Sequence, residues 1–338
     1  MLKDSNAVTT IKSLPGAALA LLLTCPAAGS QLVPGSMDVH WNEGAADCGA
    51  NPQPPIQVHP YNAQTFILRE SLCATFEAPF IYLLVGSSKA LLIDTGDVAD
   101  PTLMPLAQTV LGLLPGEGQS KLPLIVVHTH RHMDHRAGDP QFEHLAGVQV
   151  VPAYLEDVQK YFGFTDWPNG LAEVDLGNRT VDVMPVPGHN SAHVAFYDRS
   201  TGLFISGDFF LPGRLLIEDT DAALASAKRV AAFINDRPIS HVMGAHIELN
   251  TAGETLPWES SHHPDESPLQ LTKEDLLVLP DALRSFNGFY TRHGDLILTN
   301  SMHILMALAA AVLAVLVALA VWLYRFIRRR RNAAKAIA

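Results

Sequence analysis

Cysteine is scarce in this chain of 338 residues, which contains only three: Cys25, Cys48 and Cys73. None of them lies in a motif typical of a nucleophilic thiol, so the sequence gives little support to a cysteine hydrolase. Cys48 and Cys73 form an even pair that would make one disulfide in an exported protein. The sequence leaves open whether they do.

Basic residues are scarce in the body of the chain. Eight of the 23 lysines and arginines lie before residue 31 or after residue 324, whereas 33 of the 34 acidic residues lie between those points. Residues 31–324 therefore carry 15 basic against 33 acidic side chains, a net charge of −18. A body this acidic repels a phosphate backbone, which argues against nucleic acid as a partner.

Long apolar runs are missing except at the two ends, which excludes a protein with many membrane spans. Residues 304–324 are 21 positions without a charge, enough at ~1.5 Å per residue to cross the ~30 Å core of a bilayer. Four arginines, Arg328–Arg331, follow. We predict a transmembrane helix over 302–324. The positive-inside rule puts the basic tail, 325–338, in the cytoplasm and the body on the periplasmic or extracellular side.

The N-terminal end has the layout of a secretory signal. Lys3 and Lys12 precede an apolar run over 14–23, and small residues follow at 27–30. This order of charge, apolar run and small residues predicts a signal peptide over residues 1–29. Whether it is cleaved stays open.

The body mixes strand and helix patterns. An extended lead-in rich in proline, asparagine and glutamine is expected over residues 30–65, followed by the main domain over 66–295. Strands are predicted at 80–85, 90–94, 124–127, 148–151, 180–186, 193–197 and 203–205, and helices at 102–113, 153–162, 221–235 and 273–287. This mixture predicts an α/β fold with helices covering the sheets.

The most informative segment begins where the predicted buried strand 124–127 ends. It reads Val127-His128-Thr129-His130-Arg131-His132-Met133-Asp134-His135. Neutral imidazole and carboxylate form a ligand set typical of zinc. In an extended turn, one pair of these side chains would serve one ion and the next pair another: His130 with His132, and Asp134 with His135.

Two ligands per ion are too few, so this interpretation requires partners from elsewhere in the chain. Three candidates follow predicted strands, where sites open in α/β folds, and each comes after a glycine that lets the backbone turn tightly. They are His189, Asp208 and His246. His193 and His241 compete with the two histidines, but His193 begins a predicted strand and His241 lies inside one.

These motifs together resemble the metallo-β-lactamase superfamily. Thr129 to His135 matches the HxHxDH signature of that family, and the other motifs occur in the family's order. They are Asp94-Thr95-Gly96, Pro187-Gly188-His189, Gly207-Asp208 and Gly244-Ala245-His246. The resemblance spans residues 80–250, about half the chain, and implies a four-layer αββα sandwich with two metals at one sheet edge.

The resemblance also implies a role for each residue. Three histidines would hold the first ion: His130, His132 and His189. Three side chains would hold the second: Asp134, His135 and His246. Asp208 would bridge the two ions, and Asp94 would orient a ligand by hydrogen bonds from beneath. The implied cofactors are two divalent ions, zinc first, with iron or manganese left open.

Such a site implies a metal-dependent hydrolase. A hydroxide bridging the ions would attack the carbonyl of an ester, lactone, thioester or amide in a small molecule, and Asp134 or Asp208 would carry a proton to the leaving group. Asp208 stands where many true β-lactamases have cysteine, which points to relatives like glyoxalase II or the lactonases. Only roughly 50 residues separate His246 from the membrane segment, too few for the glutathione-binding tail of glyoxalase II.

Three alternatives stay open: a β-lactamase, a mononuclear iron sulfur-oxygenase relative, and a non-catalytic binding protein tethered to a membrane. His262 and His263 are expected to be a solvated loop pair, with a lid over the metals as the alternative. Phe162, Phe164 and Trp167 are expected to be core or surface aromatics, with the lining of a substrate pocket as the alternative. Substrate and oligomeric state cannot be read from the sequence.

Overall fold

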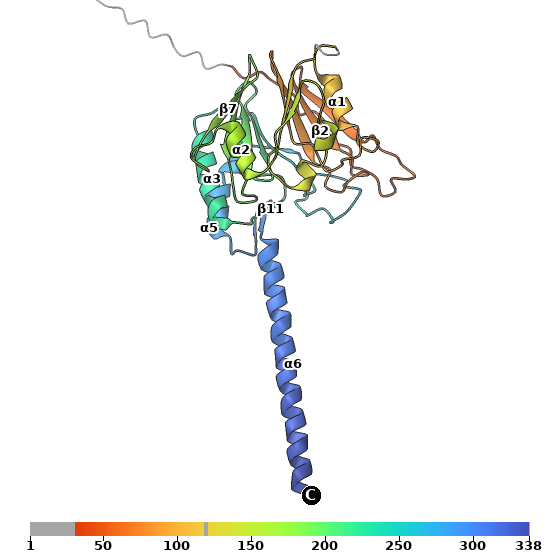
Figure 1. The fold of residues 1–338 in the computed structure, drawn as a ribbon, viewed down its shortest axis with the longest axis vertical. Coiled ribbons are helices and arrows are strands. Elements are labelled where there is room, and N and C mark those ends of the chain that lie inside the picture. The colour runs from red at the N-terminus through yellow and green to blue at the C-terminus, as the bar shows by residue number, and fades with distance from the viewer. Residues whose placement is uncertain (1–30, 118–120, 338) are drawn as a thin grey trace, which may run out of the picture. The chain divides into compact units, whose positions relative to one another are not determined.

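The computed structural model describes residues 31–117 and 121–337 (Figure 1). The predicted signal peptide and Cys25 therefore lie outside the described residues. Within them the strands form two six-stranded sheets and one three-stranded sheet. A disulfide joins Cys48 to Cys73, which ties the lead-in to the loop after the second strand.

The first sheet has strand order β1-β2-β3-β4-β5-β6. Its strands are β1 (Ile56–Asn62), β2 (Thr65–Glu70), β3 (Phe80–Val85), β4 (Ala90–Ile93), β5 (Leu124–Val127) and β6 (Val148–Val150). Every residue of β3, β4 and β5 is buried, as continuous apolar runs require. The lead-in contributes the edge strand β1, whose polar residues hid it from the sequence pattern.

The second sheet has strand order β13-β12-β10-β9-β8-β7. Its strands are β7 (Ala172–Asp175), β8 (Thr180–Pro185), β9 (Val194–Asp198), β10 (Leu203–Gly207), β12 (His241–Gly244) and β13 (Gln270–Leu271). β10 and β12 run parallel, with Gly207 opposite Gly244. The residues that follow these two glycines therefore emerge at the same edge of the sheet.

Helices cover the outer faces of both sheets. One apolar cluster fills the space between the sheets. A second packs α1 (Leu106–Leu113) on the first sheet, and a third packs α3 (Thr220–Ile234) and α5 (Leu279–Ser285) on the second. Figure 1 shows α1 beside β2, and α3 with α5 on the other side. The four-layer αββα arrangement predicted above is confirmed.

The other helices differ in detail from the predictions. The helix α2 (Leu155–Phe162) lies within the predicted range. The single helix predicted over 273–287 is two, α4 (Lys273–Leu277) and α5. Pro280 lies in the first turn of α5, and a proline tolerated there cannot supply the N–H that a continuous helix needs.

A small third sheet leads into the C-terminal helix. It consists of β11 (Arg214–Leu216), β15 (Leu296–Thr299) and β14 (Tyr290–His293), with β15 in the middle. The helix α6 (Ser301–Ile337) starts two residues after β15. Within its segment Ser301–Asn332, an 18-residue window has a mean hydropathy of 3.0, so this helix is long and apolar enough to cross a membrane.

Candidate metal centre

The three imidazoles assigned to the first ion converge. Nε2 of His130 lies 2.9 Å from Nδ1 of His132 and 3.2 Å from Nε2 of His189. The third pair, Nδ1 of His132 and Nε2 of His189, is 3.0 Å apart. Tetrahedral zinc with bonds of about 2.0–2.1 Å separates its nitrogens by about 3.3 Å. The spacing therefore suits three ligands of one ion.

The residues assigned to the second ion form a neighbouring group. Oδ2 of Asp134 lies 3.0 Å from Nε2 of His135 and 3.2 Å from Nε2 of His246. Asp208 completes the group, with Oδ1 at 3.6 Å from Nε2 of His246. One ligand atom from each of the four lies within 4.8 Å of the others.

Asp208 also reaches the first group. Its Oδ2 lies 3.5 Å from Nε2 of His189 and 3.6 Å from Nε2 of His135. The preceding Gly207 makes this approach feasible: it has a φ of +54°, and a Cβ there would lie 2.7 Å from Cβ of Thr129. A side chain at position 207 would therefore push β10 away from the HxHxDH turn.

Two buried atoms of candidate ligands make no hydrogen bond of acceptable geometry among the described residues: Nε2 of His135, despite its 3.0 Å approach to Asp134, and Oδ1 of Asp208. Buried polar atoms are normally paired, because an unpaired one loses its hydration without compensation. Metal ions in the two groups would satisfy both atoms. The donor set of imidazole nitrogens and carboxylate oxygens fits zinc-type ions, so the residues present suit the predicted cofactors.

Hydrogen bonds on the outer side orient three of these imidazoles. Nδ1 of His189 lies 2.9 Å from the carbonyl of Leu216, and Nδ1 of His246 lies 2.8 Å from the carbonyl of Glu77. A carbonyl accepts only, so each Nδ1 donates and the Nε2 lone pair is directed to the centre. Nδ1 of His135 lies in the same way 2.9 Å from Oδ2 of Asp94.

Asp94 lies beneath the turn, completely buried. Its Oδ1 accepts a hydrogen bond from the backbone N–H of Thr129 at 2.7 Å, and its Oδ2 accepts one from the Thr129 hydroxyl at 2.9 Å. The backbone of Asp94 has a φ of +69°, which aspartate tolerates better than most residues. Its contacts join the end of β4 to the HxHxDH turn.

The two groups differ in electrostatics. Burial, together with the imidazoles of His135 and His189, holds the pKa of His130 well below its ordinary value, so this ring is in the neutral form that binds metals. Burial would lower the pKa of His246, but the carboxylates of Asp208 and Asp134 raise it to about 10. In the absence of a metal, a proton on His246 therefore compensates the negative charge of these carboxylates. An ion that binds here displaces that proton.

The competing histidines have other roles. His193 is fully buried, stacks on His130 with ring centroids 4.7 Å apart, and lies 3.2 Å through its Nε2 from the carbonyl of Ser206. His241 is half-buried in β12, where its ring meets that of Tyr61 edge-on at 6.2 Å. Neither belongs to the two ligand groups.

His128, to which the sequence analysis assigned no role, forms hydrogen bonds behind the HxHxDH turn. Its Nε2 lies 2.8 Å from Oδ1 of Asp139, and its Nδ1 lies 3.1 Å from the carbonyl of Val151. Thr95 donates to the same Asp139 oxygen at 2.8 Å. The position of His128, directly after a buried strand and next to the HxHxDH signature, was the sequence signal that could have revealed this role.

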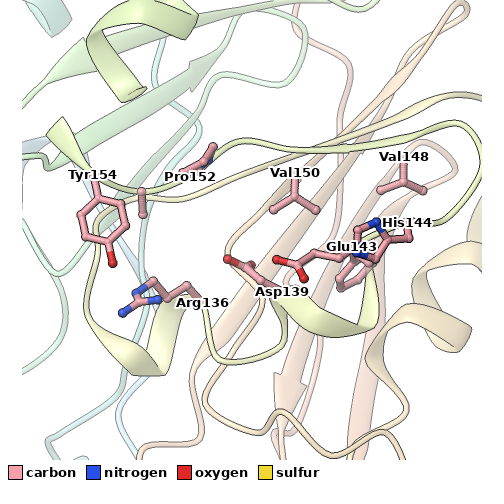
Figure 2. A pocket seen from close by; sticks show the side chains of 10 residues that line it. Arg136, Asp139, Glu143, His144, Val148, Val150, Pro152 and Tyr154 are labelled. Atoms are coloured by element: carbon pink, nitrogen blue, oxygen red, sulfur yellow. The ribbon is translucent and has the colours of Figure 1, made fainter. Parts of the chain in front are cut away.

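A cavity of about 490 Å³ lies behind this network. Figure 2 shows the carboxylates of Asp139 and Glu143 opposite Val148 and Val150 of β6, with Arg136 and Tyr154 at one end. None of the seven candidate ligands lines it. This cavity is therefore separate from the metal centre.

A smaller cavity of about 30 Å³ lies beside His246. Phe76 and Trp258 line it with ring centroids 5.2 Å apart, and the guanidinium of Arg214 lies 5.7 Å from the Trp258 ring. His263 also lines it and is buried, so the prediction of a solvated loop residue is wrong for this histidine.

The sequence did not single out Phe76 and Trp258, since loop conformations bring them together. The aromatics considered for a pocket, Phe162, Phe164 and Trp167, pack against the core between the sheets.

The family model of the metallo-beta-lactamase superfamily matches residues 74–288, well over half of the chain. The chain belongs to this superfamily. The match contains both ligand groups, and the predicted resemblance is confirmed.

Curated relatives of this superfamily member include an acyl-coenzyme A thioesterase and hydroxyacylglutathione hydrolases. The acyl-coenzyme A thioesterase MBLAC2 of Gallus gallus is 24% identical over 223 residues, which cover 56% of this chain and 80% of that protein. The hydroxyacylglutathione hydrolase of Dechloromonas aromatica is 30% identical over 188 residues, 54% of this chain and 64% of that protein. The chain thus spans less than two thirds of the latter enzyme's length.

Solved structures of the superfamily match as well. The metallo-beta-lactamase of Pontibacter korlensis is 17% identical, with a TM-score of 0.45, and the match covers 68% of this chain and all of that one. The metallo-beta-lactamase of Hirschia baltica is 12% identical with a TM-score of 0.42, and the match covers 57% of this chain and 91% of that one.

Proposed function

We propose that this protein is a dinuclear metal-dependent hydrolase that cleaves an acyl ester or thioester of a small molecule. The observation that carries the proposal is the position of Asp208. One of its carboxylate oxygens lies 3.5 Å from His189 and the other 3.6 Å from His246. A single carboxylate within reach of both ligand groups is what two neighbouring ions require of a shared ligand.

Each side chain then has a distinct task. The first ion would be held by His130, His132 and His189, and the second by Asp134, His135 and His246. Asp208 would be shared, and Asp94 would fix the ring of His135. When bound, two zinc-type ions would supply Lewis acidity to a substrate carbonyl and lower the pKa of a water between them from 15.7 towards ~7.

Asp134 and Asp208 are also suited to move protons. Their side chains remain 20% and 13% exposed, so they border both the buried ligands and the open side of the centre. In hydrolysis, water adds its oxygen to the acyl carbon, and its proton must reach the departing alcohol or thiol. A carboxylate beside the reacting water can carry that proton.

Several observations favour acyl esters and thioesters among the substrates. Asp208 replaces the cysteine of many true β-lactamases, and one relative is named as an acyl-coenzyme A thioesterase and another as a hydroxyacylglutathione hydrolase. The ring pair Phe76–Trp258 offers an apolar wall beside His246. The acidic body, with its net charge of −18 over residues 31–324, disfavours nucleic acid as substrate.

We also propose that α6 spans a membrane and that the body lies on the non-cytoplasmic side. Arg328–Arg331 directly follow the apolar segment, as a cytoplasmic flank should. The disulfide Cys48–Cys73 supports the same side, because disulfides persist in oxidising compartments.

The test is a hydrolysis panel on the full chain in detergent micelles with defined metal loading. It includes aryl esters, thioesters, lactones and cephalosporins, and the His132→Ala variant serves as the matched inactive control. Turnover of esters or thioesters by the protein with two ions, and none by the variant, is expected. One iron per chain with oxygen consumption would favour the sulfur-oxygenase relative. Two ions without turnover of any substrate would favour a binding protein.

A further inference from the structure

The small sheet connects the metal centre to the membrane helix. β15 is its middle strand, with β11 parallel on one side and β14 antiparallel on the other. The registers pair Thr299 of β15 with Leu216 of β11 and with Tyr290 of β14. These three residues therefore form one row across the sheet, at the end from which α6 continues.

The two ends of this row are exposed, whereas Thr299 between them is buried. The preceding row includes Leu215 and Leu298, which are both fully buried against α3 and α5. Side chains alternate between the faces of a sheet, so Leu216 and Tyr290 point to the opposite face. They are 43% and 51% exposed, and the adjacent Phe289 is 46% exposed. We call these three residues the apolar rim.

The apolar rim is fixed to the first turn of α6. The side chain of Asn300 caps this helix by accepting from the N–H of His303 at 2.9 Å, and the N–H of Asn300 donates to the carbonyl of Phe289 at 2.9 Å. Nδ1 of His303 donates to the carbonyl of Gly288 at 2.8 Å. The same turn exposes Met302, and Phe289 of the rim lines one cavity together with Met306 and Ala307 of α6.

The rim is also linked by hydrogen bonds to the metal centre. Ile217 donates to the carbonyl of Thr299 at 2.7 Å, and the carbonyl of Leu216 accepts the hydrogen bond that orients His189. The side chain of Asn300 donates to the carbonyl of Glu218 at 3.4 Å. Neighbouring strands lie about 4.8 Å apart, so His189 lies within about two or three strand spacings of the end of β15.

We propose that the apolar rim rests in the interfacial layer of a lipid bilayer and holds the metal centre at the membrane surface. A membrane-crossing helix that begins at Ser301 puts its first turn at this layer, where tyrosine and other aromatic rings are favoured. The rim has no flexible linker that would let the domain move away. Bilayer lipid is therefore the occupant of this surface.

The position of the metal centre at the membrane surface also indicates the class of substrate. This inference rests on the function proposed above. A centre held at the surface can reach an acyl ester or thioester whose hydrocarbon chain stays in the bilayer while its carbonyl lies among the headgroups. Met133, an exposed apolar residue within the metal-binding turn, suits such a substrate. The substrate class is accordingly an amphiphilic acyl compound.

The membrane contact is tested with the full chain in phosphatidylcholine vesicles. Trp322→Phe, which removes the tryptophan of α6, is the parent. Tyr290→Trp is added to it, and Leu103→Trp, an exposed position on the loop before α1, is the matched control. Nitroxide lipids labelled at the headgroup or in mid-chain are the probes, and thermal unfolding checks that each variant folds.

We expect a headgroup nitroxide to quench about half or more of the emission added by Tyr290→Trp and little of that added by Leu103→Trp. If the tryptophan emission of the Tyr290→Trp variant is as red-shifted and as little quenched as that of the Leu103→Trp control, the proposal is overturned. Blue-shifted emission that no lipid nitroxide quenches would also overturn it, and would indicate a second copy of the chain as the occupant.

The substrate class is tested by comparing a vesicle-embedded aryl palmitate with water-soluble aryl acetate. Changing Phe289 and Tyr290 to serine should lower the palmitate rate about five-fold and leave the acetate rate and the metal content unchanged. Equal rates for palmitate in parent and variant would contradict the substrate class. If the parent cleaves neither ester, the hydrolase proposal fails, whereas quenching still decides the membrane contact.

Discussion

Nδ1 of His135 lies 2.9 Å from Oδ2 of Asp94, and both side chains are buried beneath the metal centre. A buried carboxylate in this position keeps the proton of His135 on Nδ1 and its Nε2 free for a metal. Asp94 also accepts two hydrogen bonds from Thr129. One residue at the end of β4 therefore controls the shape of the turn and the orientation of a ligand.

Asp94→Asn should lower metal affinity about 10–100-fold, the usual cost of losing a hydrogen bond that orients a ligand. The amide supplies a donor where Asp94 supplies only acceptors, so it cannot satisfy Thr129 and His135 together. Competition with a chromophoric chelator measures the change. Asp100→Asn, at an exposed carboxylate in the following loop, is the control and should have no effect. Equal affinities for both variants would contradict the role of Asp94.

His132→Ala should abolish turnover and lower the metal content. His132 contributes one of three nitrogens that lie 2.9–3.2 Å apart, and two nitrogens hold an ion much less firmly than three. Elemental analysis and hydrolysis of an aryl ester measure both effects. His40→Ala, at an exposed histidine of the lead-in, controls for the loss of any imidazole. Full activity in the His132→Ala variant would contradict the assignment of His132 as a metal ligand required for turnover.

Glu70 should make stability depend on pH. Burial raises its pKa to about 8, and its Oε2 accepts a hydrogen bond from the N–H of Asp97 at 2.9 Å. Between pH 4.5 and about 8 the folded chain thus holds a proton that the unfolded chain has lost, so this group's contribution to the free energy of unfolding falls as pH rises.

Glu70→Gln removes this titration and keeps a neutral side chain of similar shape. The stability of the variant relative to the natural chain should therefore increase from pH 5 to pH 9, by on the order of 3 kcal/mol. Denaturant unfolding at each pH measures the difference. Parallel pH profiles for the two proteins would show that Glu70 does not titrate in this range.

Reducing the disulfide Cys48–Cys73 should destabilise the domain. The two cysteines are 25 residues apart in sequence, and closing a loop of that size stabilises by about 3 kcal/mol in the chain-entropy account. Denaturant unfolding with and without reductant measures the loss. A variant with serine at both positions should already be destabilised and should not respond to reductant. If reductant also lowered the stability of this double-serine variant, its effect on the natural chain would not come from the disulfide.

The sequence predicted which candidate ligands lie together because the candidates follow strands with a strong apolar pattern. Parallel strands such as β10 and β12 bring the residues after them to one sheet edge, so Asp208 and His246 could be assigned before their distance was known. Glycine before each candidate reinforced the assignment. The position of Gly207 against Thr129 explains why that glycine is needed.

Other parts of the molecule could not be predicted from the sequence. The strands β11, β14 and β15 have only three or four residues each, and β14 is largely polar, so their pattern does not stand out from loops. Phe76 and Trp258 meet only because two loops distant in sequence fold onto each other. Such contacts depend on tertiary packing, which local periodicity does not encode.

Anomalous scattering from crystals of the zinc-loaded protein tests the central claim most directly. We predict two zinc peaks per chain, one among His130, His132 and His189 and one among Asp134, His135 and His246, with Asp208 reaching both. A single peak, or zinc bound away from these side chains, would contradict the dinuclear centre.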